Sequence, residues 1–568
     1  MNFFAEKQKN IYVIFFIFIA VYIAHFLLLN GYGLYEDDYA QARFISADMG
    51  FYDAIKYIYL DSARPVGRVL RYGLTWLGAE IGGLTFVYVI GYLIISFNCV
   101  LVYLIIRHIS SDYLIPVIGA LLFILYPADT TKILLTHSLQ LYSAMIFALT
   151  SIYLYQQGSR ILPYAFAVLS LLSYETTLLA ILAAPFLKKD TGKGVIREAI
   201  KHALILVFLV VIALLTRSLL GESRVSGLGG VNPLELVGRI GAAMVIGPLV
   251  SAAMFVYRPV TTIIEADLSA YIVVLAFLGI TFYFLRHCSQ SVIVSHESRQ
   301  QNLRSKLLPF ISHLDFSTDM GKAAKLMMVG AVSWPFSYMF AFSSDHWPPT
   351  DIQGRMTSVH MAASFSASLT LAGLAWLFLI IFRDDERKKL FFVGVLSIYF
   401  SLLAGFSYVV QQDYVRSWVY QKEFWSQVIA LTPDQHEKTR IFFQERPEYL
   451  KQTKYVLAHS WADIIVPDSF YDFDGYYKVR FHRLTKGIVK GFHMKDNKLF
   501  FKPPQIVGDR ETEILPEDII VLYRNDDGTM VRYKGMVNFN GINIALSQTS
   551  ESNGLARTGI YNLIMGPD

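Results

Sequence analysis

Three consecutive carboxylates, Glu36, Asp37 and Asp38, lie between two tyrosines directly after the apolar stretch 11–30. We call residues 35–39 the acidic motif. A carboxylate that faces a hydroxyl group can take its proton as a general base. Adjacent side chains do not all face one cavity, so we expect one or two carboxylates to act and the third to hydrogen-bond locally. The alternative interpretation is a solvated loop at the end of a helix.

Arginines follow the acidic motif at positions Arg64, Arg68 and Arg71, and Arg355 lies in a later polar loop. The planar guanidinium group binds two phosphate oxygens at once, so arginine suits a phosphate ligand. The alternative is that these side chains extend to the anionic surface of a membrane. We interpret Arg71 in that second way. Arg64 and Arg68 remain open between the two, and Arg355 is a further candidate for a phosphate contact.

Glu175 lies inside an apolar block. A carboxylate at membrane depth needs a charged partner or a water-filled cavity. Two interpretations stay open for Glu175: a contact to a ligand, or a structural ion pair with an Arg or Lys. The polar loop around position 345 adds Asp345 and His346, which are candidates for contacting an acceptor or a metal ion. A lone histidine such as His346 is more often structural.

The composition indicates a membrane protein. The chain has 568 residues, of which 54% are hydrophobic and 17% are charged, whereas soluble proteins carry about 25% charged residues. The apolar residues form long uninterrupted blocks, which predicts a polytopic α-helical fold. The net charge of +5 is small for this length and gives no indication of a nucleic-acid partner.

Charge placement predicts the topology. Lys7 and Lys9 precede the first apolar stretch, which favours a cytoplasmic N-terminus and places the acidic motif outside, in an external loop at 31–82. Spans are predicted at 11–30, 84–106, 113–127, 138–156, 201–219, 268–286, 323–343, 360–382 and 390–410.

Two further segments are ambiguous. Residues 161–187 form either one tilted helix or two short helices broken at Ser173–Glu175. We favour two helices, because the basic segment that follows is then cytoplasmic. Residues 240–257 are weakly apolar, and we expect a re-entrant or interfacial segment there, because another crossing would break the charge pattern downstream. The prediction is about eleven crossings in total.

The composition changes near residue 411. We therefore predict a transmembrane domain at 1–410 and an extracytoplasmic α+β domain at 411–568. A helical segment opens this second domain. Short β-type runs follow, separated by turn sequences such as Asp496-Asn497 and Asn525–Gly528.

This arrangement resembles the GT-C superfamily of integral-membrane glycosyltransferases that use polyprenyl-phosphate sugars. In that family an inside N-terminus leads through one helix to a long external loop that begins with an acidic motif, the place of Glu36–Asp38 here. The Arg-Pro-x-x-Arg sequence at 64–68 is similar to the basic stretch of bacterial members. Ser173–Glu175 looks like the Ser-x-Glu element of a mid-chain helix in that family.

The resemblance implies a multi-pass protein of the inner or plasma membrane. It implies an inverting transfer of a monosaccharide from a polyprenyl-phosphate carrier to an extracytoplasmic glycan, lipid or protein. An aspartate of the first external loop would be the base, and the family's spacing favours Asp37. Some relatives use a divalent cation such as Mg²⁺ or Mn²⁺ and others do not, so the metal requirement stays open.

Two other classes of function compete with this interpretation. A polysaccharide or lipid flippase would predict inverted repeats and charged residues at mid-membrane, and no repeat stands out in the sequence. A non-catalytic membrane scaffold that binds a partner through its outer domain would leave the acidic motif without a purpose.

Overall fold

The structure is a computed structural model. It describes residues 2–45, 52, 64–110, 112–189, 194–219, 232–290, 318–341, 347–382, 385–432, 438–444, 480–502, 511–546, 561 and 563–564. The chain forms two compact units. Unit 1 comprises Met1–Leu29, Ile55–Leu74 and Tyr88–Gln412, and unit 2 comprises Asn30–Ala54, Thr75–Val87 and Asp413–Asp568. The acidic motif therefore belongs to the same unit as the C-terminal region.

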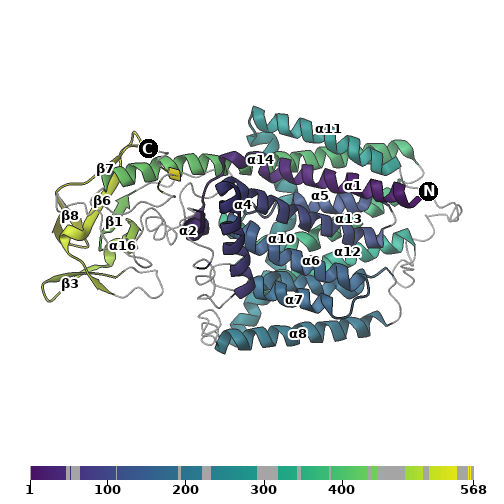
Figure 1. The fold of residues 1–568 in the computed structure, drawn as a ribbon, viewed down its shortest axis with the longest axis horizontal. Coiled ribbons are helices and arrows are strands. Elements are labelled where there is room, and N and C mark those ends of the chain that lie inside the picture. Colours follow the sequence, from purple (N-terminus) through teal and green to yellow (C-terminus); the bar gives the residue numbers. More distant parts are fainter. Residues whose placement is uncertain are drawn as a thin grey trace. The chain divides into compact units, whose positions relative to one another are not determined.

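The described residues of unit 1 form helices and loops (Figure 1). The helix α12 packs along α13, and α13 packs against α5. The main helices of unit 1 are α1 (Asn2–Val21), α4 (Pro65–Ile109), α5 (Leu114–Ile124), α6 (Tyr142–Gln156), α7 (Leu162–Ser173), η5 (Glu175–Leu187), α8 (Val195–Leu219), α10 (Pro233–Glu265), α11 (Leu268–Gln290), α12 (Asp319–Phe336), α13 (Ala363–Ile381) and α14 (Glu386–Leu431). Both α4 and α14 also contribute residues to unit 2.

Eight helices among the described residues are long and apolar enough to cross a membrane. They are Gln8–Gly31, Pro65–Ile109, His137–Gln156, Val195–Leu215, Pro233–Glu265, Leu268–Ser289, Ala363–Ile381 and Glu386–Leu431. A helix needs about 20 residues to span a bilayer. The apolar helices α5, α7 and η5 are shorter than this. The chain is thus a polytopic helical protein. Three of the eleven predicted crossings fall on these short helices, and a fourth, 323–343, overlaps α12, which is not among the eight.

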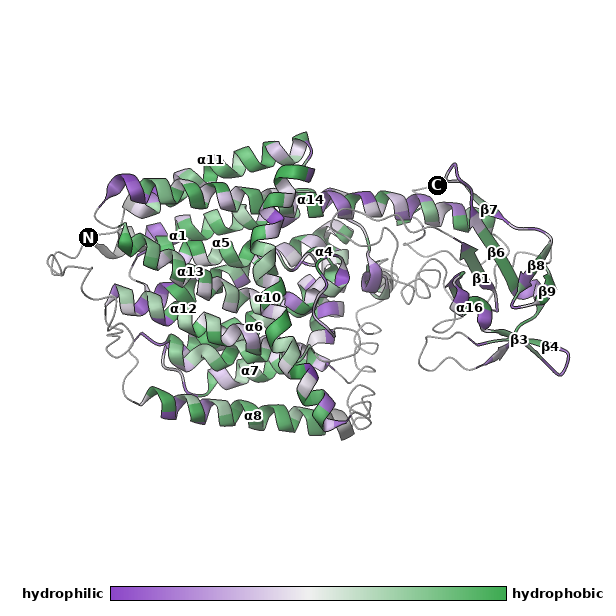
Figure 2. Cartoon of the chain, turned by 180° about the vertical axis from the view of Figure 1, so that it is seen from behind, coloured by the Kyte–Doolittle hydropathy of each residue, from purple (hydrophilic) through white to green (hydrophobic). Residues whose placement is uncertain are grey.

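Many residues of α8, α10 and α11 are hydrophobic (Figure 2). Leu215, Val256 and Tyr283 are 59%, 72% and 76% exposed. A soluble protein rarely exposes large apolar patches, whereas lipid chains cover such a surface at no cost. The exposed side chains therefore support a membrane-embedded unit 1.

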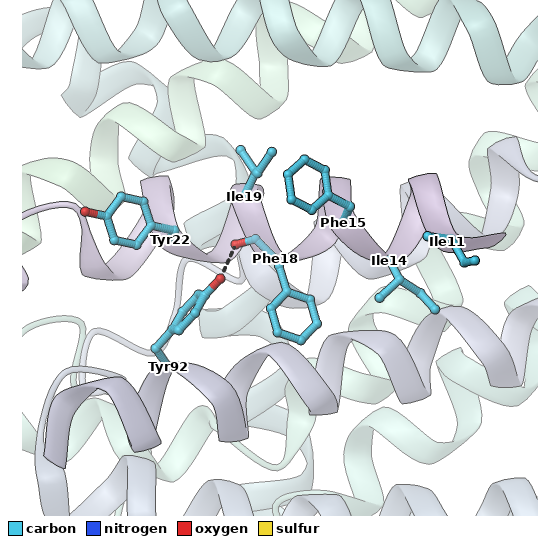
Figure 3. A pocket seen from close by; sticks show the side chains of 7 residues that line it. All are labelled: Ile11, Ile14, Phe15, Phe18, Ile19, Tyr22 and Tyr92. Carbon is cyan, nitrogen blue, oxygen red and sulfur yellow. Dashed lines mark hydrogen bonds between the residues drawn. The ribbon is translucent and has the colours of Figure 1, made fainter. Parts of the chain in front are cut away.

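An apolar groove of about 450 Å³ also runs along α1 (Figure 3). It is lined by Ile11, Ile14, Phe15, Phe18, Ile19, Tyr22 and Tyr92. The Tyr92 hydroxyl donates a hydrogen bond to the Phe18 carbonyl oxygen at 3.1 Å. This bond satisfies the Tyr92 hydroxyl, so that side chain can lie against hydrocarbon.

The predicted break in segment 161–187 is confirmed. Helix α7 ends at Ser173, Tyr174 is extended with φ −161° and ψ 120°, and the 3₁₀ helix η5 begins at Glu175. The Ser173 hydroxyl donates to the Leu169 carbonyl at 2.7 Å, and the Thr177 hydroxyl donates to the Tyr174 carbonyl at 2.9 Å. These side chains supply hydrogen bonds to the backbone where the helical pattern is interrupted.

The structure shows an unbroken helix at 240–257, where we expected a re-entrant or interfacial segment. This segment lies inside α10, a continuous helix of 33 residues that is long and apolar enough to span a membrane. Its small residues allow close packing, since Gly247 lies against the ring of Tyr338. Small residues at helix contacts are typical of membrane proteins, so weak apolarity was a poor guide here.

Unit 2 contains the described strands. They are β1 (Arg440–Gln444), β2 (Arg480–Arg483), β3 (Phe492–Lys495), β4 (Lys498–Phe501), β5 (Thr512–Glu513), β6 (Ile519–Arg524), β7 (Met530–Arg532), β8 (Met536–Phe539) and β9 (Ile542–Ala545). The largest sheet has the order β2-β1-β6-β7. In it β2, β1 and β6 are parallel, and β7 is antiparallel to β6. The predicted turns at Asp496-Asn497 and Asn525–Gly528 join β3 to β4 and β6 to β7.

Aromatic residues fill both faces of the β1 strand. Phe442 packs against the rings of Phe492 and Phe501 at centroid distances of 5.1 and 5.4 Å. On the other face Phe443 packs against Phe424 of α14 at 5.5 Å. The last turns of α14 are therefore part of the core of unit 2.

We predict that Phe442→Ala destabilises unit 2. Phe442 is completely buried, and removing a buried phenyl ring costs about 3–5 kcal/mol through lost burial and a cavity. Hydrogen exchange in the full-length protein should show faster exchange in β1 and β6. Met494→Ala, at a half-exposed position of β3, is the control. Equal exchange in the two variants would contradict the assignment of this core.

Candidate functional site

The acidic motif begins the 3₁₀ helix η3 (Glu36–Gln41). The Asp38 amide donates to the Tyr35 carbonyl at 2.9 Å. Glu36 has φ 48°, in the left-handed region, and such a conformation costs on the order of 1–3 kcal/mol in a residue other than glycine. Asp38 is completely buried, while Glu36 and Asp37 are partly exposed. This strained turn thus leaves Glu36 and Asp37 partly exposed, with one carboxylate oxygen of each buried, and buries Asp38 completely.

The two tyrosines of the acidic motif fix η3 to α14. The Tyr35 hydroxyl donates to the Tyr414 carbonyl at 2.8 Å, and their rings meet edge to face at 4.8 Å. The Tyr39 hydroxyl donates to Oε1 of Gln421 at 2.9 Å. Burial raises the pKa of the Tyr35 hydroxyl far above its ordinary value, so this hydroxyl remains protonated and able to donate.

Gly33 allows this loop to pack closely against α14. A Cβ atom on Gly33 would lie 1.7 Å from Cδ2 of Trp418, a distance that no side chain accepts. The sequence analysis did not find Tyr414, Trp418 and Gln421 as partners of the acidic motif. Their i, i+4, i+7 spacing predicts one helix face, but nothing in the sequence links that face to residues almost 400 positions earlier.

A second group of predicted residues lies in unit 1. The Arg64 guanidinium binds both carboxylate oxygens of Glu175: Nε lies 3.1 Å from Oε2 and Nη2 lies 2.6 Å from Oε1. Arg64 precedes the first residue of α4, and Glu175 is the first residue of η5. The guanidinium also lies over the Tyr174 ring, 4.3 Å from its centroid. The structure therefore brings these two predicted residues together as an ion pair.

The first turn of α4 is held against the break between α7 and η5. A Cβ atom on Gly67 would lie 2.5 Å from the Ser173 carbonyl oxygen. This carbonyl accepts a hydrogen bond from Nε2 of Gln140 at 3.3 Å. Carbonyl groups at helix ends need such outside donors, so Gln140 stabilises the break that places Glu175.

Two more arginines, Arg68 and Arg71, follow Arg64 in the first two turns of α4. Nη1 of Arg68 donates to the Tyr72 hydroxyl at 2.7 Å. The guanidinium groups of Arg68 and Arg71 lie 5.6 and 5.2 Å from the centroid of the Tyr72 ring. Arg71 is buried, which differs from the expectation that it extends to a lipid surface. Stacking on an aromatic ring explains how this charge is accommodated.

Arg355 is the first residue of the short helix η8 (Arg355–His360) and is partly exposed. Hydrogen bonds from Thr130 hold the backbone on either side of it. The Thr130 amide donates to the Thr357 hydroxyl at 3.1 Å, and the two hydroxyl groups lie 2.9 Å apart. The Thr357 hydroxyl also donates to the Gly354 carbonyl at 2.7 Å. These contacts fix the position of the backbone at Arg355.

The loop that carries Thr130 is itself held by a buried charge cluster. Asp129 accepts hydrogen bonds from the Thr131 hydroxyl at 2.6 Å and the Tyr142 hydroxyl at 2.7 Å. Burial opposes ionisation of Asp129, but Lys132 and these hydroxyls hold the pKa of its carboxyl below the ordinary value. Burial lowers the pKa of the Lys132 ammonium. The interactions of this cluster compensate the burial of the polar side chains in this loop.

Asp345 and His346 lie outside the described residues. Within the described ranges, the structure contains no group of three or more His, Cys, Asp or Glu residues placed to hold a metal ion.

Comparisons of the chain with protein-family models, curated proteins and solved structures gave no match.

We predict that Gly33→Ala disrupts the packing of the acidic motif against α14. The new methyl group would displace the Trp418 ring, and overpacking of this kind costs about 1–3 kcal/mol. Hydrogen exchange of residues 413–421 should become faster in the full-length protein. Gly73→Ala is the control, because a Cβ atom there has no neighbour within 4 Å. Unchanged exchange in Gly33→Ala would argue against this packing.

We also predict that Thr130 and Thr357 are energetically coupled. Thr130→Val and Thr357→Val each remove the same hydroxyl contact, so their combined effect on stability should be smaller than the sum by about 1 kcal/mol. A double-mutant cycle on the unfolding free energy of the full chain measures this. Additive effects would show that the contact does not hold the segment around Arg355.

Proposed function

We propose that this chain is a membrane glycosyltransferase. It transfers a monosaccharide from a polyprenyl-phosphate carrier to an extracytoplasmic glycan, lipid or protein. The observation that carries the proposal is the acidic motif: a strained turn, anchored to α14 by two tyrosines, that displays partly exposed carboxylates. Strained backbone persists where the surrounding structure holds it, and such positions cluster at active sites.

The proposed reaction is a single displacement at the anomeric carbon. The acceptor oxygen forms a bond to this carbon as the bond to the carrier's phosphate oxygen breaks, which inverts the configuration. The proton of the acceptor hydroxyl passes to a carboxylate of the acidic motif. The polyprenyl phosphate departs with the bonding electrons and needs no general acid, because a phosphate is a weak base.

Asp37 is the residue we assign as the base. Asp38 is completely buried, so an acceptor does not reach it without rearrangement of η3. Glu36 occupies the strained position of the turn. Asp37 is partly exposed and needs no such rearrangement, in agreement with the expectation from the family's spacing. In this proposal Asp38 holds the turn, and Asp37 takes the proton.

Arginines of unit 1 supply the phosphate contacts in the proposal. The two-point contact of Arg64 with Glu175 has the geometry that a guanidinium group uses for phosphate oxygens. Arg68 and Arg355 are partly exposed and would add positive charge for the leaving group. Positive charge that is already in place stabilises the departing phosphate in the transition state.

The proposed location is the inner or plasma membrane, with a cytoplasmic N-terminus and an extracytoplasmic C-terminal region. The eight long apolar helices support the membrane location. The topology rests on the charge pattern of the sequence.

We predict that Asp37→Asn lowers transfer at least about 100-fold, the usual contribution of a general base. Its thermal stability should be unchanged, since Asp37 is partly exposed. Asp38→Asn should lower both transfer and stability, because Asp38 is buried. The measurement uses the purified full-length protein with candidate polyprenyl-phosphate monosaccharides and follows release of polyprenyl phosphate. Glu80→Gln, at an exposed carboxylate of α4, should retain full activity.

Wild-type rates in both aspartate variants would overturn the catalytic role of the acidic motif. Lipid translocation by a wild type that shows neither transfer nor hydrolysis would support a flippase instead. Partner binding with neither activity would support a scaffold.

A further inference from the structure

The Arg64–Glu175 pair has the geometry of a ligand contact within the chain. One edge of the guanidinium group, Nε and Nη2, meets the two carboxylate oxygens of Glu175. A phosphate group offers the same guanidinium edge two oxygens at a similar spacing. A phosphate and Glu175 therefore compete for one edge of Arg64.

The exposure of the pair allows exchange. The side chains of Arg64 and Glu175 are 15% and 25% exposed. Breaking a fully buried ion pair leaves a charge without water, which is strongly unfavourable. An ion pair at the surface contributes little and opens readily. This pair lies between those limits, and water reaches both partners when it opens.

Arg64 is held by more than Glu175. Its guanidinium lies over the Tyr174 ring, and the close contact of Gly67 with Ser173 fixes the first turn of α4. The arginine therefore keeps its place when the carboxylate leaves.

The surrounding charge favours an incoming anion. Arg68 and Arg71 follow Arg64 in the first two turns of α4. Their guanidinium groups lie 5.6 and 5.2 Å from the centroid of the Tyr72 ring. These two further positive charges in the same segment favour the approach of an anion to Arg64.

We propose that Glu175 is an internal stand-in for the donor phosphate, occupying the guanidinium edge of Arg64 until the phosphate of the polyprenyl carrier displaces it. This inference rests on the proposed function for the identity of the ligand. It assigns Glu175 a role in tuning affinity: the carboxylate keeps Arg64 oriented in the empty protein and lowers the affinity for the carrier. Glu175 is thus a positioning residue, and Arg64 is the contact to phosphate.

The test is equilibrium binding of a synthetic polyprenyl monophosphate to the full-length protein in nanodiscs. The apparent affinity for the phosphate equals the affinity of free Arg64 multiplied by the fraction of protein in which Glu175 does not occupy Arg64. Glu175→Gln removes the competing charge, so it should bind the polyprenyl monophosphate about threefold to tenfold more tightly than the wild type. Arg64→Gln should bind it at least about tenfold more weakly. A polyprenol of equal length should not distinguish these proteins.

The matched control is Glu235→Gln. Glu235 contacts Arg239 through the same nitrogen atoms at the same distances, 3.1 and 2.6 Å, but lies on α10. Its loss should leave the affinity for the polyprenyl monophosphate unchanged. Glu175→Asp keeps the charge and should stay close to the wild type.

A purely structural pair gives a different result. Folded Glu175→Gln would then bind the polyprenyl monophosphate no more tightly than the wild type, and this result would overturn the inference. Thermal stability of each variant shows that the comparison is between folded proteins. Wild-type binding that does not exceed binding of the polyprenol would also overturn it. The base assigned to Asp37 is judged separately, since the binding test involves no transfer.

Discussion

Charged side chains withdrawn from water are stable only where another group compensates them, and the placement of the candidate residues follows from this constraint. Arg64 is compensated by Glu175 and by the Tyr174 ring. Asp129 is compensated by Lys132 and by hydroxyl donors. Each compensation fixes a backbone segment: the start of α4 in the first case, and the loop that holds the residues flanking Arg355 in the second. Residues suited to phosphate binding are thereby set in place before any ligand arrives.

In unit 2 the carboxylates of the acidic motif are positioned by aromatic packing and by tyrosine hydroxyls. Tyr35 and Tyr39 reach the backbone and side chains of α14, and Gly33 lets the loop approach Trp418. The same helix continues into the aromatic core around Phe443. The acidic motif is consequently tied to a folded unit and does not behave as a solvated loop.

Local patterns in the sequence predicted much of this, because they depend on neighbouring residues. Apolar runs predicted the long helices, the basic segment after residue 187 favoured the break before Glu175, and Asp496-Asn497 predicted a turn. Contacts between distant segments were not predictable. The partner of Glu175 lies 111 residues earlier, and the partner of Tyr35 lies 379 residues later. The weakly apolar segment of α10 was expected to be re-entrant or interfacial. Its small residues instead pack closely within one long helix.

The central claim is that the acidic motif acts on a sugar carried by a polyprenyl phosphate. Mass spectrometry of the lipids that co-purify with full-length protein tests this most directly, with the wild type and Asp37→Asn compared. The account predicts that Asp37→Asn retains an intact polyprenyl-phosphate monosaccharide, because the donor binds but its sugar is not transferred. The wild type should retain mainly polyprenyl phosphate. Bulk phospholipids alone, in both folded proteins, would contradict the account.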